Sequence, residues 1–482
     1  MIDRVTNDIL YRIEKGYCEI LGAGVSNVPL VKWLAARGAN ITVRDVKTRE
    51  NIRNADELEA VGAELICGEG YLLGLGEKSD PQKTLIFRSP GMRPDIPAIA
   101  AATEKGCILT SEMELFFRIT KANIVAVTGS DGKTTTTTLV GKILEAGAKK
   151  GRVFVGGNIG KPLLPDNEVM TEDDFAVVEL SSFQLQTMQT SAKTAVITNI
   201  TENHLDWHTG MDEYTEAKYN VFRHGECEKL IVCADNELSK NAAFLATNGK
   251  TKLVFFSLKA NKYEETVPVG IANATAIYER NGLIYYSDGA DESVLMKSSD
   301  IKIPGRHNVL NYMAAFAATS EHVSPETVKK VATEFGGVEH RIELVRELNG
   351  VKYYNSSIDS TPTRTAAALS SFNDKVIVIC GGYDKNLSYA PLAVTLCDRA
   401  KVAVVTGACA DKILAALDAY EGYKDSALQV CKVTDFNEAV NKARELAEEG
   451  DTVILSPAAA SFDAFRNFAE RGDKFKNIVN SF

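Results

Sequence analysis

A segment near residue 130 carries residue types that bind phosphate. Residues Val127–Thr134 read Val-Thr-Gly-Ser-Asp-Gly-Lys-Thr, directly after an apolar run and directly before a stretch of helical period. The backbone N–H groups of such a loop converge on phosphate at a helix start, while Lys133 supplies positive charge and the Thr134 hydroxyl can ligate Mg²⁺. Val127 replaces the first glycine of the strict P-loop pattern. A Gly-rich turn without a ligand is the alternative, but Gly-Lys-Thr at this position indicates binding of a nucleoside triphosphate.

Two further groups of polar residues could complete a phosphate and metal site. Glu179 ends the apolar run Phe175–Leu180, and a carboxylate at the carboxyl end of a strand can bind Mg²⁺ directly or through water. A solvated strand end is the alternative. His204 and His208 are four residues apart, as in some zinc sites, but Leu205 stands where a zinc protease has glutamate, so hydrolytic zinc is disfavoured. We expect His204 to be an outlying Mg²⁺ ligand if a phosphate lies beside it.

A weaker nucleotide signal lies near the N-terminus. The residues Gly22-x-Gly24-x-x-Asn27, with Asp45 at the end of the next apolar run, imitate a dinucleotide fingerprint whose third glycine is missing. A nucleotide or another phosphate-bearing substrate is therefore favoured over NAD, with Ser26 and the helix start near its phosphates. A packing turn is the alternative.

These residues lie in a repeated pattern of short apolar runs, Gly-rich turns and segments of helical period, which is typical of parallel α/β units. The first β-α-β motif comprises the strand Cys18–Leu21, a helix through Trp33–Ala36 and the strand Asn40–Val43. The later strands are predicted at Ile124–Thr128, Phe175–Leu180, Ala195–Asn199, Val376–Cys380, Val402–Thr406 and Thr452–Leu455. Between residues 275 and 286, two β-prone runs around Asn281-Gly282 predict a structural antiparallel hairpin.

The chain is predicted to be an α/β protein of three domains. Its 482 residues exceed one compact core, since a domain holds roughly 100 to 200 residues. Shifts in the pattern place boundaries near residues 111 and 337, where Gly336-Gly337 would serve as a hinge. The expected domains are residues 1–111, 112–337 and 338–482.

Composition narrows the class of protein. The chain has 54 Lys and Arg against 64 Asp and Glu, and the resulting net charge of −10 has the wrong sign for binding nucleic acid or anionic membranes. No run approaches the roughly eighteen apolar residues of a membrane helix, and the N-terminus lacks a signal-peptide pattern. The nine cysteines are scattered and without a Cys-x-x-Cys pair, which indicates buried free thiols rather than disulfides or a thiolate metal site. We expect a cytosolic protein.

In order and approximate spacing, the polar segments resemble those of the Mur ligases over essentially the whole chain. The matching segments are Thr128–Thr135, Gly157–Gly160, Glu179–Gln184, Asn203–Asp206, Gly305–Asn308, His340-Arg341, Gly381–Lys385 and Leu455–Phe468. Within the family, Ser111–Glu114, Leu180–Gln184 and Ser461–Phe468 are most similar to the members that add D-glutamate. The Asp-Asn-Pro-Arg segment of the members that add a diamino acid next is absent.

The resemblance implies a Rossmann-like N-terminal domain for the UDP-sugar, a central P-loop ATPase-like domain, and a C-terminal Rossmann-like domain for the amino acid. It implies that ATP phosphorylates the carboxylate of UDP-N-acetylmuramoyl-L-alanine and that the amine of D-glutamate then attacks the acyl phosphate, in cytoplasmic peptidoglycan precursor synthesis. Mg²⁺ would be the metal cofactor, nucleic acid and membranes would not be partners, and a monomer is expected. The residues alone do not separate a ligase from a kinase or an ATPase.

The resemblance also assigns roles to residues. The ATP-binding residues would be Gly129, Ser130, Asp131, Gly132, Lys133, Thr134, Thr135, His307, Asn308 and Arg341. The Mg²⁺ ligands would be Thr134, Glu179, His204 and Lys218, and the residues essential to catalysis would be Lys133, Glu179, His204 and Lys218. The UDP-sugar would contact Ser26, Asn158, Ser181 and Gln184, and D-glutamate would contact Lys385, Ser461, Phe462 and Phe468. His307 and Asn308 would lie near the adenine, and Arg341 would reach the phosphates from the third domain. Lys218 matches a lysine that is carbamylated in the family, although the sequence alone indicates only an exposed helical lysine.

Two segments depart from the family pattern. Ser356 stands where related ligases commonly have an acidic residue near the nucleotide ribose, and Asp359, which could compensate, is shifted along the chain. The segment Asp45-Val46-Lys47 matches only loosely, so the uracil-binding residues are not predicted. The alternatives left open are a sibling amino acid ligase such as a folylpolyglutamate-type enzyme, an NAD-dependent oxidoreductase and a non-catalytic nucleotide-binding module.

Overall fold

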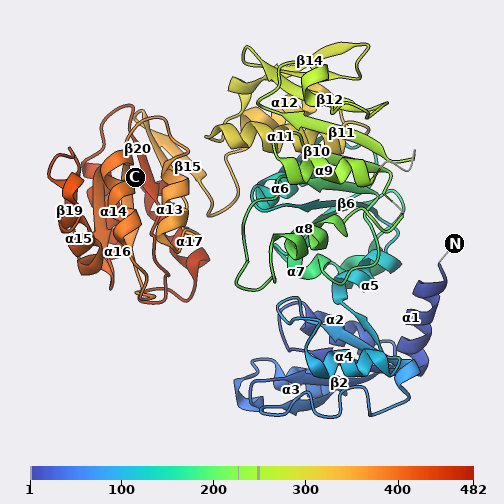
Figure 1. The fold of residues 1–482 in the computed structure, drawn as a ribbon. Helices are drawn as coiled ribbons and strands as arrows, with labels where there is room; N and C mark the ends of the chain where they lie inside the picture. Colours follow the sequence, from blue (N-terminus) through green and yellow to red (C-terminus); the bar gives the residue numbers. More distant parts are fainter. Residues whose placement is uncertain (1–2, 226, 247–249) are drawn as a thin grey trace. The chain divides into compact units, whose positions relative to one another are not determined.

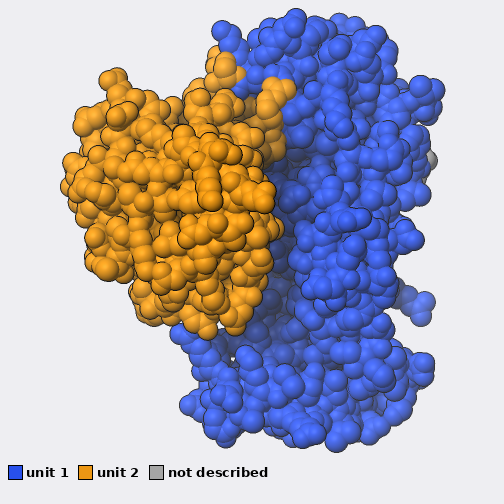
Figure 2. All heavy atoms as spheres, turned by 60° about the vertical axis from the view of Figure 1, so that its left-hand side comes forward, with its two compact units in different colours: residues 1–298, 310–328 blue, residues 299–309, 329–482 orange. Residues whose placement is uncertain are grey.

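The structure is a computed structural model that describes residues 3–225, 227–246 and 250–482. The chain forms two compact units, one of residues 1–298 and 310–328 and the other of residues 299–309 and 329–482 (Figure 2). The described residues contain three β-sheets, two in the first unit and one in the second. The three sheets confirm the predicted α/β class, whereas the domain boundaries near residues 111 and 337 remain a proposal.

The N-terminal sheet has five parallel strands in the order β3-β2-β1-β4-β5. They are β1 (Tyr17–Leu21), β2 (Asn40–Asp45), β3 (Glu64–Cys67), β4 (Thr84–Arg88) and β5 (Ile108–Thr110). The helices around it are α1 (Arg4–Lys15), α2 (Asn27–Ala35), α3 (Ala55–Ala60), α4 (Pro97–Glu104) and α5 (Glu112–Ile119). Leu85 and Phe87 of β4 join one buried cluster and Ile86 another, so helices cover both faces of the sheet. The strand order reverses beside β1, which is where open α/β sheets bind ligands.

The central sheet has nine strands in the order β14-β13-β12-β11-β10-β9-β6-β8-β7. They are β6 (Asn123–Thr128), β7 (Val153–Gly157), β8 (Phe175–Glu179), β9 (Thr194–Ile197), β10 (Lys229–Cys233), β11 (Lys252–Ser257), β12 (Thr275–Arg280), β13 (Leu283–Ser287) and β14 (Glu292–Lys297). The helices are α6 (Lys133–Gly147), α7 (Ser182–Leu185), α8 (Met211–Tyr219), α9 (Glu237–Leu245), α10 (Tyr263–Thr266), α11 (Arg306–Thr319) and α12 (Pro325–Glu334). The helix α6 packs against β6, β7 and β8 (Figure 1).

The predicted hairpin at Asn281-Gly282 is confirmed. Both residues have positive φ, 53° and 76°, and β12 pairs with β13 in antiparallel register. The hairpin does not stand apart, because β12 also pairs with β11 in parallel and extends the central sheet.

The sheet of the second unit has six strands in the order β15-β16-β20-β17-β18-β19. They are β15 (Glu343–Leu348), β16 (Val351–Asn355), β17 (Val376–Gly381), β18 (Ala400–Thr406), β19 (Gln429–Lys432) and β20 (Thr452–Leu455). The helices are α13 (Pro362–Leu369), α14 (Ala390–Arg399), α15 (Ala410–Asp418), α16 (Phe436–Glu445) and α17 (Phe468–Asn480). Alternate residues of β17 enter two separate cores, so this sheet is also covered on both faces. Buried parallel strands read as continuous apolar runs, which is why β17, β18 and β20 were predicted.

All nine cysteines are free thiols, seven of them buried and two, Cys67 and Cys431, half-buried. Among the residues that the structure describes, no helix is both long enough and apolar enough to cross a membrane.

Candidate active site

The loop of residues 129–132, called here the P-loop, joins the end of β6 to the start of α6 and depends on two glycines. Gly129 has φ 145° and Gly132 has φ 77°. A Cβ atom on Gly129 would lie 1.9 Å from Thr198 Oγ1, and one on Gly132 would lie 2.5 Å from Asn311 Oδ1. Side chains at these positions would therefore collide with neighbouring segments as well as strain the backbone.

The residues that follow β9 hold the P-loop in shape. The backbone N–H of Ser130 donates to Asn199 O at 2.8 Å, and that of Asp131 donates to Asn199 Oδ1 at 3.0 Å. The Thr198 hydroxyl donates to Asp131 O at 2.6 Å. The first N–H groups of α6, from Lys133 onward, have no acceptor within the helix. The loop is thus rigidly placed beside N–H groups that suit an anion.

Two lysines bind backbone carbonyls of the same loop. Lys133 Nζ donates to Ser130 O at 2.9 Å, and Lys218 Nζ, from α8, donates to Gly129 O at 2.7 Å. Lys218 is only 1% exposed, so the expectation of an exposed lysine is wrong. Its burial, and then the positive charge of Lys133, hold its pKa well below the usual range, against the opposing effect of Asp131 and Glu179.

Glu179 ends β8, next to β6 in the sheet, with Val127 as its register partner. Its side chain is buried, and Oε1 accepts a hydrogen bond from Asn158 Nδ2 at 2.8 Å. The other oxygen, Oε2, is buried without a hydrogen-bond donor among the described residues. A buried carboxylate oxygen is costly unless a cation or a donor compensates it. Glu179 therefore fits the role of a Mg²⁺ ligand.

His204 follows β9 on a turn and has φ 54°, a left-handed conformation. Its ring lies 4.8 Å from the ring of Phe183, centroid to centroid. Burial, followed by the charges of Lys133 and Lys218, lowers its pKa, which favours the neutral imidazole that can act as a metal ligand. The structure thus places His204 close enough to Lys133 and Lys218 for their charges to act on it.

His208 has a different environment from His204. Residues 204–208 form a turn rather than a helix, and His208 Nε2 lies 2.9 Å from Ser182 Oγ. The two histidines therefore do not share a helical face.

The remaining residues predicted at the P-loop and beside the sugar are placed as follows. Asp131 is exposed, and Thr134 and Thr135 are half-buried in the first turn of α6. Ser181 and Gln184 form a capping box at the start of α7: Ser181 Oγ accepts from the Gln184 N–H and Gln184 Oε1 from the Ser181 N–H. Their contact with a substrate remains a prediction.

In the turn after β1, Asn27 stands where a dinucleotide fingerprint has its third glycine, and its side chain has a structural role. The Asn27 side-chain amide donates to Leu21 O at 3.1 Å and to Gly22 O at 2.9 Å, which holds the turn after β1. The Asp45 carboxylate accepts from the backbone N–H of Ala23 at 2.8 Å. Ser26 lies half-buried at the start of α2, without a capping hydrogen bond. Asp45 thus helps to hold the turn after β1.

In the second unit, Arg341 lies between two residues in left-handed conformations, His340 with φ 62° and Ile342 with φ 45°. Such backbone is strained for a β-branched residue and gathers at functional sites. The Ser356 hydroxyl accepts from the Ile342 N–H at 3.2 Å, so the residue that departs from the family pattern holds this turn. Asp359 is also buried, and burial raises its pKa to about 6.

Three of the four predicted amino-acid contacts, Lys385, Ser461 and Phe462, lie in loops at the carboxyl ends of two adjacent strands, β17 and β20, and the fourth, Phe468, begins the helix α17. Lys385 is exposed after β17, and Ser461 is buried after β20. Phe462 is 63% exposed and Phe468, at the start of α17, is 40% exposed. Exposed phenylalanines at this edge can contact a ligand. At the start of α11, His307 is exposed and Asn308 is buried, with its amide donating to Pro304 O at 2.6 Å.

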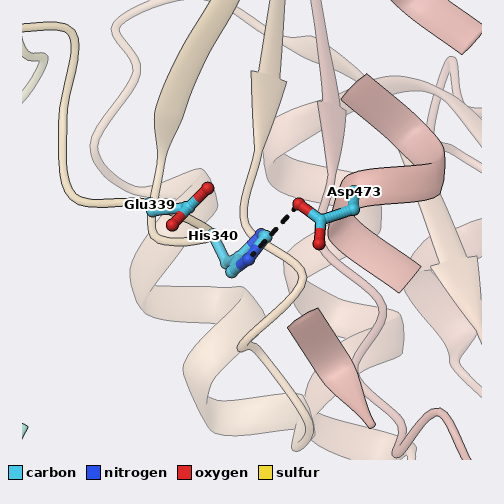
Figure 3. Close-up of side chains that lie close together, drawn as sticks. All are labelled: Glu339, His340 and Asp473. Carbon is cyan, nitrogen blue, oxygen red and sulfur yellow. Dashed lines mark ion pairs between the residues drawn. The ribbon is translucent and has the colours of Figure 1, made fainter. Parts of the chain in front are cut away.

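Sequence analysis did not identify a cluster of Glu339, His340 and Asp473, whose ligand atoms lie within 4.8 Å of one another (Figure 3). Lys476 already forms ion pairs with both carboxylates, and its Nζ is 3.3 Å from Asp473 Oδ1. Since an ammonium group supplies the cation there, we interpret the cluster as a structural ion-pair network.

Comparisons with known proteins agree with this arrangement. Three family models match in order: a Mur ligase MurD-like N-terminal domain over residues 17–111, a Mur ligase middle domain over 127–319, and a Mur ligase glutamate ligase domain over 340–459. Two proteins named UDP-N-acetylmuramoylalanine–D-glutamate ligase are each 44% identical. The one from Acetivibrio thermocellus aligns over 98% of both chains, and the one from Ruminiclostridium cellulolyticum over 96% of both.

Solved structures share the fold at low sequence identity. A UDP-N-acetylmuramoyl-L-alanyl-D-glutamate–2,6-diaminopimelate ligase has a TM-score of 0.55 at 16% identity, covering 83% of this chain and 86% of its own. A pseudomurein peptide ligase type C from Methanothermus fervidus has a TM-score of 0.51 at 18% identity, covering 96% and 99%. The domain models and the relatives aligned over nearly the whole chain show that the chain belongs to the Mur ligases, a family of ATP-dependent ligases.

Proposed function

We propose that the chain joins D-glutamate to UDP-N-acetylmuramoyl-L-alanine in cytoplasmic peptidoglycan precursor synthesis. The choice of these two substrates is supported by the relatives that are 44% identical, because both are named UDP-N-acetylmuramoylalanine–D-glutamate ligase. The observation that carries the chemistry is the buried Glu179, with one carboxylate oxygen lacking a donor among the described residues, next to a P-loop bound by two lysines. This arrangement suits phosphoryl transfer from ATP.

In the first step, a carboxylate oxygen of the alanyl group attacks the γ-phosphorus of ATP, and ADP leaves with the electrons of the broken P–O bond. The product is an acyl phosphate. The chain contributes the N–H groups of the P-loop and the Lys133 ammonium, which stabilise charge on the transferring phosphoryl group. Positioning and charge stabilisation are sufficient, so no enzyme nucleophile is required.

In the second step, the amine nitrogen of D-glutamate attacks the acyl carbon. The tetrahedral intermediate then expels inorganic phosphate, and the nitrogen loses a proton. The loops after β17 and β20, which carry Lys385, Ser461 and Phe462, would bind the amino acid together with Phe468 at the start of α17. A lysine ammonium and a serine hydroxyl provide donors for its two carboxylates.

Thr134, Glu179, His204 and Lys218 would hold Mg²⁺. The ion, when bound, neutralises charge on the ATP phosphates. Lys218 would serve as a carbamate: its neutral amine forms an N–C bond to CO₂ and releases a proton, which creates an oxygen ligand suited to Mg²⁺. The lowered pKa of Lys218 supports this step, because it favours the neutral amine.

The test is to measure phosphate release with each candidate pair of substrates, together with mass spectrometry of the product. We expect phosphate only when ATP, UDP-N-acetylmuramoyl-L-alanine and D-glutamate are all present, with a product heavier by one glutamyl residue. Activity with a different amino acid or acceptor would support a sibling ligase instead. Reduction of NAD without phosphate release would overturn the proposal.

A further inference from the structure

Arg471 places a charged guanidinium inside the second unit. It lies in α17, drawn in red in Figure 1, and is only 2% exposed. Its five N–H groups donate five hydrogen bonds. Two go to Ser357, from Nε to Oγ at 3.0 Å and from Nη2 to the carbonyl oxygen at 2.8 Å. The others go to backbone carbonyls, from Nη1 to Ala460 O at 3.0 Å and from both Nη1 and Nη2 to Ala459 O at 3.1 Å. Every acceptor is a neutral oxygen.

Burying this charge is costly without a hydrogen-bonded carboxylate. Burial lowers the pKa of Arg471 to about 10, so the group stays charged at pH 7. A buried cation that binds only carbonyl and hydroxyl oxygens is suited to holding backbone in a fixed shape. The planar fork of arginine can bind several acceptors in one plane, which a lysine cannot.

The acceptors belong to two loops that leave adjacent strands. Ser357 follows β16, whereas Ala459 and Ala460 follow β20, and the strands pair up to Asn355 and Leu455. Ala458 has φ 56°, so the second loop also contains a left-handed residue. Arg471 therefore fixes the separation of two loops at one edge of the sheet.

A third loop, after β17, packs against the same side chain. A Cβ atom on Gly382 would lie 3.1 Å from Arg471 Nη1 and 2.3 Å from Ala460 O. The backbone N–H of Tyr383 donates to Ala460 O at 2.9 Å. The loops after β16, β17 and β20 thus meet at Arg471.

These loops carry the residues proposed to bind D-glutamate. Ser461 directly follows Ala460, and Lys385 follows Tyr383 by two residues. The Ser357 hydroxyl, which accepts from Arg471, donates to Phe468 O at 2.8 Å. Arg471 is itself too deeply buried to meet a ligand.

We propose that Arg471 is a positioning residue for the amino-acid site, which holds the Ser461 loop and Phe468 in the geometry that D-glutamate requires. This inference rests on the proposed function. The contacts of Arg471 lead to the Ser461 loop and to Phe468, so the inference concerns D-glutamate rather than the ATP phosphates.

The test uses steady-state kinetics of the full chain with Arg471→Lys and Arg471→Met, varying one substrate at a time. We expect the D-glutamate KM to rise about tenfold or more in both variants, since one or more hydrogen bonds that fix the loops are lost. The KM values for ATP and UDP-N-acetylmuramoyl-L-alanine should stay within about twofold. Lys474→Met, at an exposed position of the same helix, is the matched control and should behave as wild type.

Ser357→Ala is a smaller change that keeps the test informative if the arginine variants do not fold. It removes the hydroxyl between Arg471 and Phe468 and should raise the D-glutamate KM in the same direction. Folded variants with reduced kcat or melting temperature but an unchanged D-glutamate KM would overturn the positioning role. Wild-type enzyme that releases phosphate without any dependence on D-glutamate would overturn the proposed function, and this inference with it.

Discussion

The side-chain amine of Lys218 lies 2.7 Å from the carbonyl oxygen of Gly129, so a buried lysine of α8 is bound to the first glycine of the P-loop. The contact links the helix that carries a proposed metal ligand to the loop proposed to hold ATP phosphates. It also keeps the amine out of water and close to Lys133, the two causes of its lowered pKa.

Replacing Lys218 should show whether this residue acts as a carbamate ligand of Mg²⁺ or only packs against the P-loop. We expect Lys218→Ala to be inactive and to regain part of its activity when short carboxylic acids are added, because these can occupy the place of a carbamate and supply oxygen ligands. Phosphate release measured with and without added acetate or propionate provides the readout. Full activity of the variant, with no effect of added acid, would exclude the carbamate.

Lys133→Ala should remove activity while the chain stays folded. In the proposed reaction the ammonium would stabilise charge that develops during phosphoryl transfer, and removal of one such group costs about 100-fold or more in kcat. Circular dichroism and thermal melting would establish that the variant is folded. Lys149→Ala, at an exposed position beyond the end of α6, is the control and should keep normal turnover.

The Mg²⁺ requirement should depend on Glu179. Glu179→Gln keeps an oxygen for Asn158 but loses the charge, and we expect the Mg²⁺ concentration for half-maximal activity to rise about tenfold or more. Titration of activity with MgCl₂ measures this directly. Glu172→Gln, an exposed residue shortly before β8, should leave the titration unchanged. An unaltered Mg²⁺ dependence of Glu179→Gln would remove Glu179 from the metal site.

The sequence carries a local signal for some residues of the candidate site. Gly129, Gly132 and Lys133 could be recognised because a phosphate-binding loop needs glycines, a lysine and a helix start within a few residues. Glu179 could be recognised because it ends an apolar strand. Lys218 was misjudged, because its burial comes from packing of α8 against a loop 89 residues earlier in the chain.

Arg471 could not be predicted at all. Its partners are backbone carbonyls and one hydroxyl, which leave no pattern of residue types, and they lie 11 to 114 positions away in the chain. The capping box of Ser181 and Gln184 has a local signature, yet the resemblance drew both residues toward a substrate role. Their capping role is established only by their hydrogen-bond partners, and their substrate role stays a prediction.

A buried carboxyl outside the site should make stability depend on pH. Burial raises the pKa of Glu112, at the start of α5, from 4.5 to about 7. Between these values the folded state holds a proton that the unfolded state has lost, so the free energy of unfolding falls as pH rises through this window. The loss is at most about 3.5 kcal/mol, since one pKa unit corresponds to about 1.4 kcal/mol.

Glu112→Gln should remove this part of the pH dependence. We expect the free energy of unfolding, measured with denaturant, to fall less between pH 5 and pH 8 in the variant than in the wild type. Glu104→Gln, an exposed residue at the end of α4, is the matched control and should follow the wild type. If the free energy of unfolding fell equally in all three proteins, ionisation of Glu112 would not destabilise the folded state.

The last prediction separates direct contact with the amino acid from the positioning role of Arg471. Lys385 is exposed on the loop after β17, where its ammonium can meet the side-chain carboxylate of D-glutamate. Lys385→Ala should cost roughly 1.5 to 3 kcal/mol, the range for a hydrogen bond to a charged group, which raises the D-glutamate KM about ten- to a hundredfold. The ATP KM should change far less, because the P-loop belongs to the other unit. Lys385→Ala should also raise the KM for an analogue with a side-chain carboxylate far more than for one without it, whereas Arg471→Lys should weaken both alike. Equal sensitivity of Lys385→Ala to the two analogues would assign Lys385 to loop structure rather than to recognition of that carboxylate.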